Sequence, residues 1–219
     1  MKDFREYCDV NNLDNKLKCV GNRKDYILTI TDEYLKGLKK EVSLDVIIYD
    51  IIDLTNSKID TYNLEILKKS NLRKYSYIIS LNALQVAKIA MYYYKVSKFF
   101  WNVEDLDSNK FSLSFYQKDG YNKGLYNTCN SDLNKILRII NPIMKIYEVE
   151  EALRYFRSFA PEVVRTTDKD LIPVNNGIFD YKNKKLLDFD PKYAFLSKSR
   201  VDFNNHLINY YIEYVVQII

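Results

Sequence analysis

The sequence is poor in glycine, which limits the phosphate-binding chemistry it can carry. A P-loop needs the spacing Gly-x-x-x-x-Gly-Lys-Ser/Thr, because backbone amides surround the phosphates and the lysine reaches the terminal ones. The 219 residues contain five glycines, none of which precedes a lysine: Gly21, Gly37, Gly120, Gly124 and Gly177. The sequence therefore carries no ATPase of the P-loop type.

Histidine and cysteine are also scarce. One histidine, His206, and three scattered cysteines, Cys8, Cys19 and Cys129, do not give the ligand spacing of a zinc site. The cysteines are predicted to be free thiols in a reducing cytoplasm. Because no nucleophile–histidine arrangement is visible, we expect no catalytic residue, no bound metal and no cofactor.

Long apolar runs are absent as well. No uncharged stretch approaches the roughly 20 apolar residues of a membrane span, and the charged start of the chain lacks the apolar core of a signal peptide. We therefore expect no membrane partner. Residues 205–219 form an apolar tail, which we expect either to dock on the domain as a helix or to be a truncated end.

The chain does have enough apolar material for a core. Hydrophobic residues make up 47% of the sequence and aromatic residues 15%, which is typical of an ordered chain. The net charge of +4 permits a nucleic-acid partner without requiring one. Twenty tyrosines beside many lysines, asparagines and isoleucines indicate an AT-rich coding genome, as in a virus or mobile element.

Local patterns predict an α+β fold, with a mostly helical body over 60–160. Apolar residues at helical spacing predict helices at 81–100, 132–140 and 147–159, the last with a Glu150–Arg154 pair. Alternation predicts strands at 26–31 and 111–115, the second followed by a hairpin turn at Asp119-Gly120, and residues 163–166 read as a further strand. Residues 44–54 are predicted to form a helix that ends at 55–57; the alternative is a buried strand over 46–49. Residues 63–69 are predicted to form a short helix.

The strongest local pattern lies at 171–203. Short apolar segments alternate there with turns of Asn, Gly, Lys and Pro, which predicts a small antiparallel β-meander packed on the helical body. Gly177, in the first of these turns, is predicted to supply the positive φ that a tight reversal requires.

The same stretch resembles a known family. The run IPVNNGIFD at 172–180, a lysine-rich turn, Asp190-Pro191 and the run SRVDF at 199–203 are similar to the end of the N-terminal region of phage and plasmid primase–helicases, the relatives of the poxvirus primase–helicase. A weaker, collinear similarity extends back to Phe99. The resemblance implies a DNA-replication protein of a phage, plasmid or virus, in a region that precedes a hexameric ATP-driven helicase motor.

The resemblance also suggests a division of the chain. We expect an unplaced N-terminal region at 1–80, a primase–helicase N-terminal-like domain at 81–204 and the apolar tail at 205–219. The catalytic motor residues of the family have no matching positions here, so none is assigned.

Basic residues gather in one part of the sequence. Residues 63–100 hold seven lysines and arginines against the single acid Glu65, a net charge of +6. On the predicted helix, basic and aromatic residues share a stripe: Lys88, Tyr92, Lys95 and Phe99. This stripe could follow a phosphate backbone and stack bases; the alternative is a solvated face whose lysine stems cover aromatic rings. The predicted nucleic-acid-binding residues are Lys88, Tyr92, Lys95, Lys98, Arg154, Arg157 and Arg165.

These features favour a non-catalytic replication module that binds single-stranded nucleic acid or assembles with a helicase motor or other replication proteins. One alternative is a metal-dependent primase that uses Asp105 and Asp107, although the loose spacing in 104–107 is more typical of an acidic turn. A second alternative is a protein-interaction domain without any nucleic-acid partner.

Overall fold

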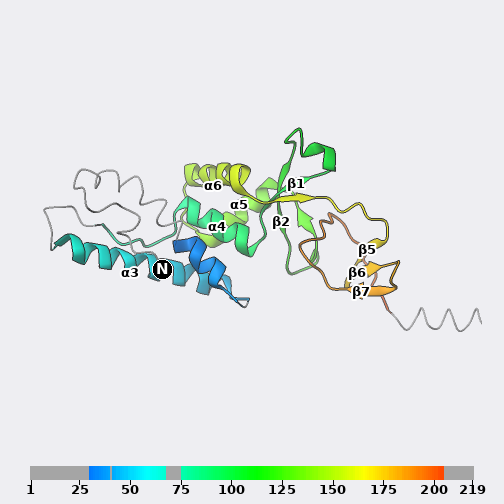
Figure 1. The fold of residues 1–219 in the computed structure, drawn as a ribbon, viewed down its shortest axis with the longest axis horizontal. Helices are drawn as coiled ribbons and strands as arrows, with labels where there is room; N and C mark the ends of the chain where they lie inside the picture. The colour runs from blue at the N-terminus through cyan, green and yellow to red at the C-terminus, as the bar shows by residue number, and fades with distance from the viewer. Residues whose placement is uncertain (1–29, 40, 68–74, 205–219) are drawn as a thin grey trace, which may run out of the picture. The chain divides into compact units, whose positions relative to one another are not determined.

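The computed structural model describes residues 30–39, 41–67 and 75–204, and the chain forms two compact units (Figure 1). Unit 1 contains the chain up to Val96 together with Asn130–Ala160, and unit 2 contains Ser97–Cys129 together with the chain from Pro161 onward. Each unit is therefore built from two separate stretches of sequence. The expectations for Cys8, Cys19, most of the 26–31 strand, and the apolar tail with His206 lie outside the described residues.

The described part of unit 1 is helical. A helical segment over residues 30–37 precedes α3 (Leu44–Leu67), α4 (Ala83–Tyr93), α5 (Asn130–Ile140) and α6 (Ile146–Phe159). α4 packs against both α5 and α6, and its core side chains Val86 and Ile89 are fully buried, as are Leu137 and Phe156. The helices predicted at 132–140 and 147–159 are confirmed. The strand predicted at 26–31 is wrong over its two described residues, which belong to the 30–37 helical segment.

α3 is one continuous helix, although the sequence suggested a break at Thr55-Asn56-Ser57 or a strand at 46–49. The reason is a stripe of four buried residues at a spacing of four: Ile47, Ile51, Thr55 and Ile59. Thr55 belongs to this stripe, and its hydroxyl donates a hydrogen bond to Ile51 O at 2.7 Å. The polar triplet therefore continues the helix, and the helix predicted from residue 63 is its last part.

Two asparagines on α3 hold the extended segment 75–78. The Asn56 side chain donates to Ile78 O at 2.9 Å and accepts from Ile78 N at 2.8 Å. Seven residues later, Asn63 makes the same two bonds with the backbone of Tyr75, at 2.9 and 2.8 Å. Residues seven apart lie on one helix face, so the two amides fix both ends of this segment against α3.

The helix predicted at 81–100 ends early. It begins with a capping box, in which Asn82 Oδ1 accepts from Leu84 N and Gln85 N, and it ends at Tyr93. Lys95 has a φ of 51°, and Val96 N donates to Ala90 O, which is how many helices terminate. Residues beyond this point form a strand, so the helical stripe that the sequence suggested does not extend past Lys95.

Unit 2 contains a four-stranded sheet of order β3-β2-β1-β4. Its strands are β1 (Ser97–Phe100), β2 (Ser112–Tyr116), β3 (Tyr126–Asn127) and β4 (Glu162–Val164). The predicted strands at 111–115 and 163–166 are confirmed, and so is a hairpin between β2 and β3. The turn of this hairpin is longer than Asp119-Gly120 suggested, because residues 121–124 belong to it and β3 begins only at Tyr126. The pair β1–β4 is parallel, which the sequence did not predict. A core cluster of Phe99, Tyr116, Tyr126 and Ala194 includes residues of β1, β2 and β3.

The predicted meander is present as β5 (Leu171–Val174), β6 (Gly177–Asp180) and β7 (Lys185–Leu187), paired antiparallel in that order. Its core cluster joins Ile178 to Leu125 and Phe195. Gly177 does not have a positive φ, so the predicted reason for it is wrong. A Cβ at this position would lie 2.5 Å from Leu187 O, so glycine is needed because β7 approaches closely.

The sequence also predicted a fourth segment of the meander at Phe195–Phe203, and this segment is not a strand. Its end nevertheless lies beside the first turn. Ser199 N donates to Pro173 O at 2.9 Å and Asn175 N donates to Val201 O at 3.1 Å. Asn176 then both donates to Phe203 O and accepts from Phe203 N, each at 2.9 Å. The two runs that carry the family resemblance, 172–180 and 199–203, are therefore in direct contact. Together, the helices and sheets confirm the α+β class.

Candidate nucleic-acid interface

The seven predicted nucleic-acid-binding residues are divided between the two units. Five lie in unit 1, on α4 or just after it and on α6: Lys88, Tyr92, Lys95, Arg154 and Arg157. The other two lie in unit 2, Lys98 on β1 and Arg165 directly after β4. The end of α4 at Tyr93 separates Lys98 from the helical residues with which the sequence grouped it.

Lys88 is engaged inside unit 1. Its ammonium group forms an ion pair with Asp32 Oδ2 at 3.0 Å and lies 5.4 Å from the centre of the Tyr155 ring. Burial alone would lower the pKa of Lys88, but hydrogen bonds with Tyr155 and Asp32 outweigh it and raise the pKa above its ordinary value. Lys88 therefore joins the 30–37 helical segment to α4 and α6, and it is the least available of the unit 1 candidates.

Tyr92 and Lys95 form a basic–aromatic pair at the end of α4. The Lys95 ammonium lies 5.0 Å from the centre of the Tyr92 ring, and both side chains are partly exposed. The left-handed backbone at Lys95 makes this geometry possible, because it turns the chain back at the last helical turn. A ring with a cation beside it is a combination that proteins use to bind a base and its phosphate.

The two arginines of α6 differ in their surroundings. Arg154 forms the predicted pair with Glu150, at 3.6 Å and with both side chains largely exposed. Such a pair contributes little stability and can open for another anion. Arg157 is exposed, and no carboxylate among the described residues pairs with it.

In unit 2, Lys98 and Glu162 face each other across the parallel β1–β4 pair at 2.8 Å, and the Lys98 side chain is only 13% exposed. Its ammonium group also lies 5.7 Å from the centre of the Phe111 ring. Arg165 extends the same strand pair through its backbone, since its N donates to Phe100 O at 2.9 Å. Its side chain is exposed and has no ion-pair partner in the described ranges.

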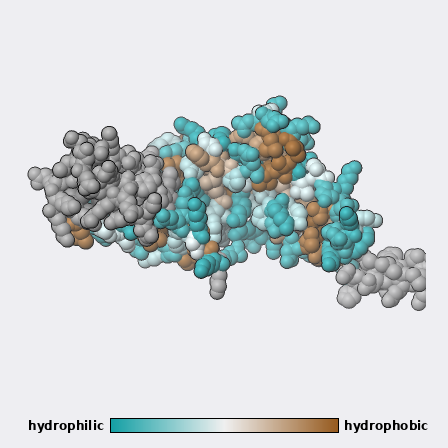
Figure 2. Space-filling view, viewed as in Figure 1, coloured by the Kyte–Doolittle hydropathy of each residue, from teal (hydrophilic) through white to brown (hydrophobic). Residues whose placement is uncertain are grey.

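The acidic stretch Glu104–Asp107 follows β1 and overlaps a short 3₁₀ helix, η2 (Val103–Asp105). Asp105 Oδ2 accepts from Asn102 N at 3.1 Å and from Asn102 Nδ2 at 3.4 Å, as a local cap. In Figure 2, hydrophobic side chains gather around this loop, where Val103 is 69% exposed, and a narrower hydrophobic strip lies among the hydrophilic side chains over the β5–β7 meander. Within the described ranges, no three His, Cys, Asp or Glu residues come together as metal ligands.

A basic cluster that the sequence analysis missed lies between the β2–β3 loop and the 198–200 segment. Arg200 donates to Tyr121 O at 2.9 Å and to Asn122 Oδ1 at 3.1 Å, and its guanidinium carbon lies 3.5 Å from the centre of the Tyr121 ring. Lys198 donates to Lys123 O at 3.0 Å. These contacts join residues more than 70 positions apart, so no local sequence pattern reveals the cluster. The sequence feature that could have pointed to it is the run SRVDF at 199–203, which carries the family resemblance.

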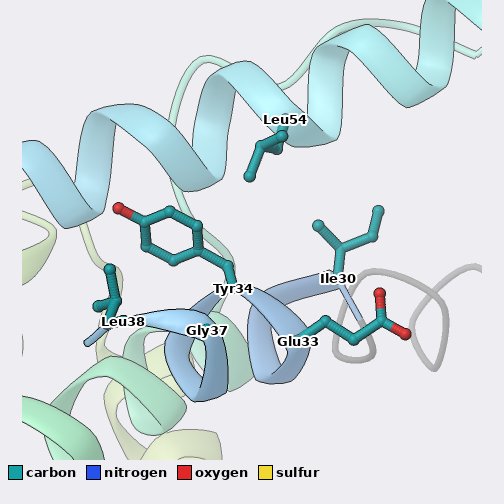
Figure 3. Close-up of a pocket in the computed structure, with 6 residues that line it drawn as sticks. All are labelled: Ile30, Glu33, Tyr34, Gly37, Leu38 and Leu54. Atoms are coloured by element: carbon teal, nitrogen blue, oxygen red, sulfur yellow. The ribbon is translucent and has the colours of Figure 1, made fainter. Parts of the chain in front are cut away.

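A hollow of about 450 Å³ in unit 1 was also absent from the sequence analysis. Ile30, Leu38 and Leu54 make its lining mainly apolar, and Figure 3 shows Tyr34 reaching from the 30–37 helical segment toward α3. The Tyr34 hydroxyl donates to Asp50 at 2.5 Å, and burial together with this bond raises the pKa of Tyr34. The hollow presents no group of residues that indicates chemistry.

Comparison with known proteins now identifies the chain. A family model described as "D5 N terminal like" matches residues 87–213, which is more than half of the sequence. The chain is thus a replication module related to primase–helicases. It belongs to the D5 N-terminal-like family, the N-terminal domain of phage and viral primase–helicase proteins, as the resemblance at 172–203 implied. No curated protein matches the chain.

The match begins inside α4, and it includes the first stretch of unit 2 and the second stretch up to residue 213. Among the helices of the described ranges, none combines the length and the apolar composition that a membrane crossing requires.

Proposed function

We propose that this chain is a non-catalytic module of a primase–helicase system and that it binds single-stranded nucleic acid. The observation that supports this most is the repeated placement of a basic group over an aromatic ring. Six such pairs involve tyrosine in the described residues: Tyr155–Lys88, Tyr92–Lys95, Tyr121–Arg200, Tyr147–Lys145, Tyr181–Lys184 and Tyr193–Lys192. Proteins that bind single strands without sequence preference combine such cations with rings on which bases stack.

The seven predicted residues differ in how easily a phosphate can reach them. Lys88 and Lys98 are held by ion pairs and are mostly buried, so a phosphate would have to displace a carboxylate to reach them. Arg157 and Arg165 are exposed and need no such exchange. We therefore assign the larger part of the phosphate contact among the seven to these two arginines, with Tyr92 and Lys95 as the basic–aromatic pair.

The test is a fluorescence-anisotropy titration of the full chain with a labelled oligothymidylate over a series of salt concentrations. Changing Arg157 and Arg165 together to Gln should weaken binding to all sequences alike. If each contacts one phosphate, the slope of log K against log salt should fall by about 1.4, since each phosphate neutralised on a single strand contributes about 0.7.

The matched control changes Lys135 and Lys169 to Gln, which removes the same charge from one exposed position in each unit. Lys135 already pairs with Asp132, and Lys169 lies between Asp168 and Asp170, so this control should bind like the unchanged chain. Absence of binding at low salt, or equal losses in both double variants, would contradict the proposal.

A second candidate role, assembly with a helicase motor or other replication proteins, is supported by apolar side chains around the α5–α6 connection. Ile139, Ile143 and Ile146 are 57%, 64% and 74% exposed. A chain that binds no oligonucleotide would leave this role as the better explanation. The alternative of a primase built on Asp105 and Asp107 gains no support, because the Asp105 carboxylate caps its own loop.

A further inference from the structure

We propose that Tyr121, Lys123 and Arg200 form a single-strand contact site in unit 2, where Tyr121 stacks on a base and the two cations hold the adjoining phosphates. This inference rests on the proposed function and names a site that the sequence analysis did not contain. Its residues come from the loop between β2 and β3 and from the 199–203 segment, which the family resemblance had singled out without a role.

The Arg200 guanidinium is fixed in position. Its two hydrogen bonds, to Tyr121 O and Asn122 Oδ1, use two of its five N–H donors, so three remain for an anion. A guanidinium that is already oriented loses little side-chain entropy on binding, and its planar fork matches the two oxygens of a phosphate. Arg200 is exposed, so a phosphate can reach it.

Tyr121 provides the surface for a base. The guanidinium of Arg200 lies 3.5 Å from the ring centre, so it covers one face of the ring. The side chain is nevertheless 71% exposed, which leaves the rest of the ring to solvent. An aromatic ring held on one side by a cation and open on the other suits the stacking of a nucleobase.

The charges around the ring are unbalanced. Lys123, Lys198 and Arg200 gather there, and burial first, then the charges of Arg200 and Lys123, lower the pKa of Lys198. The carboxylate of Asp202 opposes this shift, but it also accepts a hydrogen bond from Asn175 Nδ2 at 2.8 Å. Lys123 is exposed, and in the described part of the chain no carboxylate pairs with it. Like charges held together repel one another, and a bound phosphate relieves that repulsion.

Single-stranded nucleic acid fits this site better than a small anion or an acidic peptide. A free phosphate would use the cations and leave the ring without a role. An acidic peptide offers carboxylates but no flat ring of matching size. A nucleotide strand supplies both parts at adjoining positions, a base for Tyr121 and phosphates for Lys123 and Arg200.

Two single changes test the site in the full chain without disturbing its fold. In Tyr121→Leu the carbonyl that accepts from Arg200 remains, and in Lys123→Gln the carbonyl that accepts from Lys198 remains. Affinity of the Tyr121→Leu variant for labelled oligothymidylate should fall by roughly five-fold or more, the lower end of the stacking contribution per base. The Lys123→Gln variant should lower the salt slope by about 0.7.

The matched controls are Tyr49→Leu and Lys169→Gln. Tyr49 is 70% exposed, like Tyr121, but it belongs to none of the basic–aromatic pairs described above. Lys169 lies between two aspartates. Neither control should change affinity or slope. Thermal unfolding midpoints of all four variants should stay close to that of the unchanged chain, which excludes loss of folding as the cause.

The outcomes separate the two proposals. Binding that depends on Arg157 and Arg165 but not on Tyr121 or Lys123 overturns this site and leaves the proposed function standing. No binding by the unchanged chain overturns both. Inorganic phosphate or a polyaspartate peptide that competes equally well in the unchanged chain and in the Tyr121→Leu variant also overturns the inference, because it shows an anion site without base stacking.

Discussion

Two glycines in the β2–β3 loop of unit 2 allow backbone strain and steric overlap to be measured separately. Gly120 and Gly124 have φ values of +77° and +87°, so an alanine at either position adopts a left-handed backbone. A Cβ at Gly120 would meet nothing within 4 Å. A Cβ at Gly124 would lie 2.1–2.5 Å from three atoms of the Phe189 ring.

The expected sizes follow from these contacts. A left-handed conformation costs a non-glycine residue about 1–3 kcal/mol, and the smaller unfolded-state entropy of alanine offsets about 0.4–1 kcal/mol. Gly120→Ala should therefore lower the free energy of unfolding by about 1 kcal/mol. Gly124→Ala must also displace Phe189 from the core cluster around Ile178, which adds about 1–3 kcal/mol of overpacking. Gly124→Ala should therefore lower the free energy of unfolding by about 2–4 kcal/mol in total.

The assay is urea denaturation followed by tryptophan fluorescence. Trp101 is the single tryptophan and lies in unit 2, so the signal reports the unit that contains both glycines. Repeating Gly124→Ala in a Phe189→Ala background should reduce its cost to that of Gly120→Ala, because the overlapping ring is gone. Equal costs for the two glycine variants, or a Gly124→Ala cost that Phe189→Ala leaves unchanged, would refute the steric reasoning.

Two further predictions concern hydrogen bonds made by asparagines. Asn56→Ala removes both bonds to Ile78 and should lower the free energy of unfolding by about 1–2 kcal/mol. Hydrogen exchange at the Ile78 amide should become faster, and unchanged exchange there would contradict the role assigned to Asn56. Hydrogen bonds from Asn183 lower the pKa of Asp180 below 3.8, so the stability that this carboxylate contributes is present above pH 3.8 and is lost as the pH falls through the lowered value. Asn183→Ala removes the side-chain bond and keeps the backbone one, so an NMR titration should show a low pKa that moves part of the way back toward 3.8 in this variant. An equal pKa in both proteins would show that the Asn183 side chain is not the cause.

The elements that could be predicted from the sequence are those whose signal is local. α5 and α6 have clear apolar faces, the β2–β3 hairpin has Asp119-Gly120, and the meander has its turns. α3 was divided in error because Thr55 and Asn56 usually favour turns, whereas here their side chains are satisfied by Ile51 O and by Ile78. That second partner is 22 residues away and leaves no mark on the local pattern.

The helix predicted at 81–100 was too long for a related reason. The apolar and basic residues of 94–100 continue the helical spacing of α4, but their burial is decided by pairing of β1 with β2 and β4. Phe99 was therefore assigned to a surface stripe although it is fully buried. The candidate site changed accordingly. Among the residues chosen for helical spacing, Lys88 is ion-paired and Lys98 lies on β1, whereas Tyr92 and Lys95 form a pair at the end of α4. The cluster at Arg200 depends on contacts across unit 2.

The interrupted order of the two units has a consequence for synthesis on the ribosome. β1, β2 and β3 emerge before α5 and α6, which unit 1 needs to cover α4, and β4 follows only after both helices. Neither unit is complete until about residue 160 has left the exit tunnel, so the buried faces of α4 and β1 stay uncovered for much of translation. Chains with such distant pairings fold slowly and expose apolar surface meanwhile. The nascent protein therefore passes through a long stage in which its own packing does not yet protect this apolar surface from aggregation.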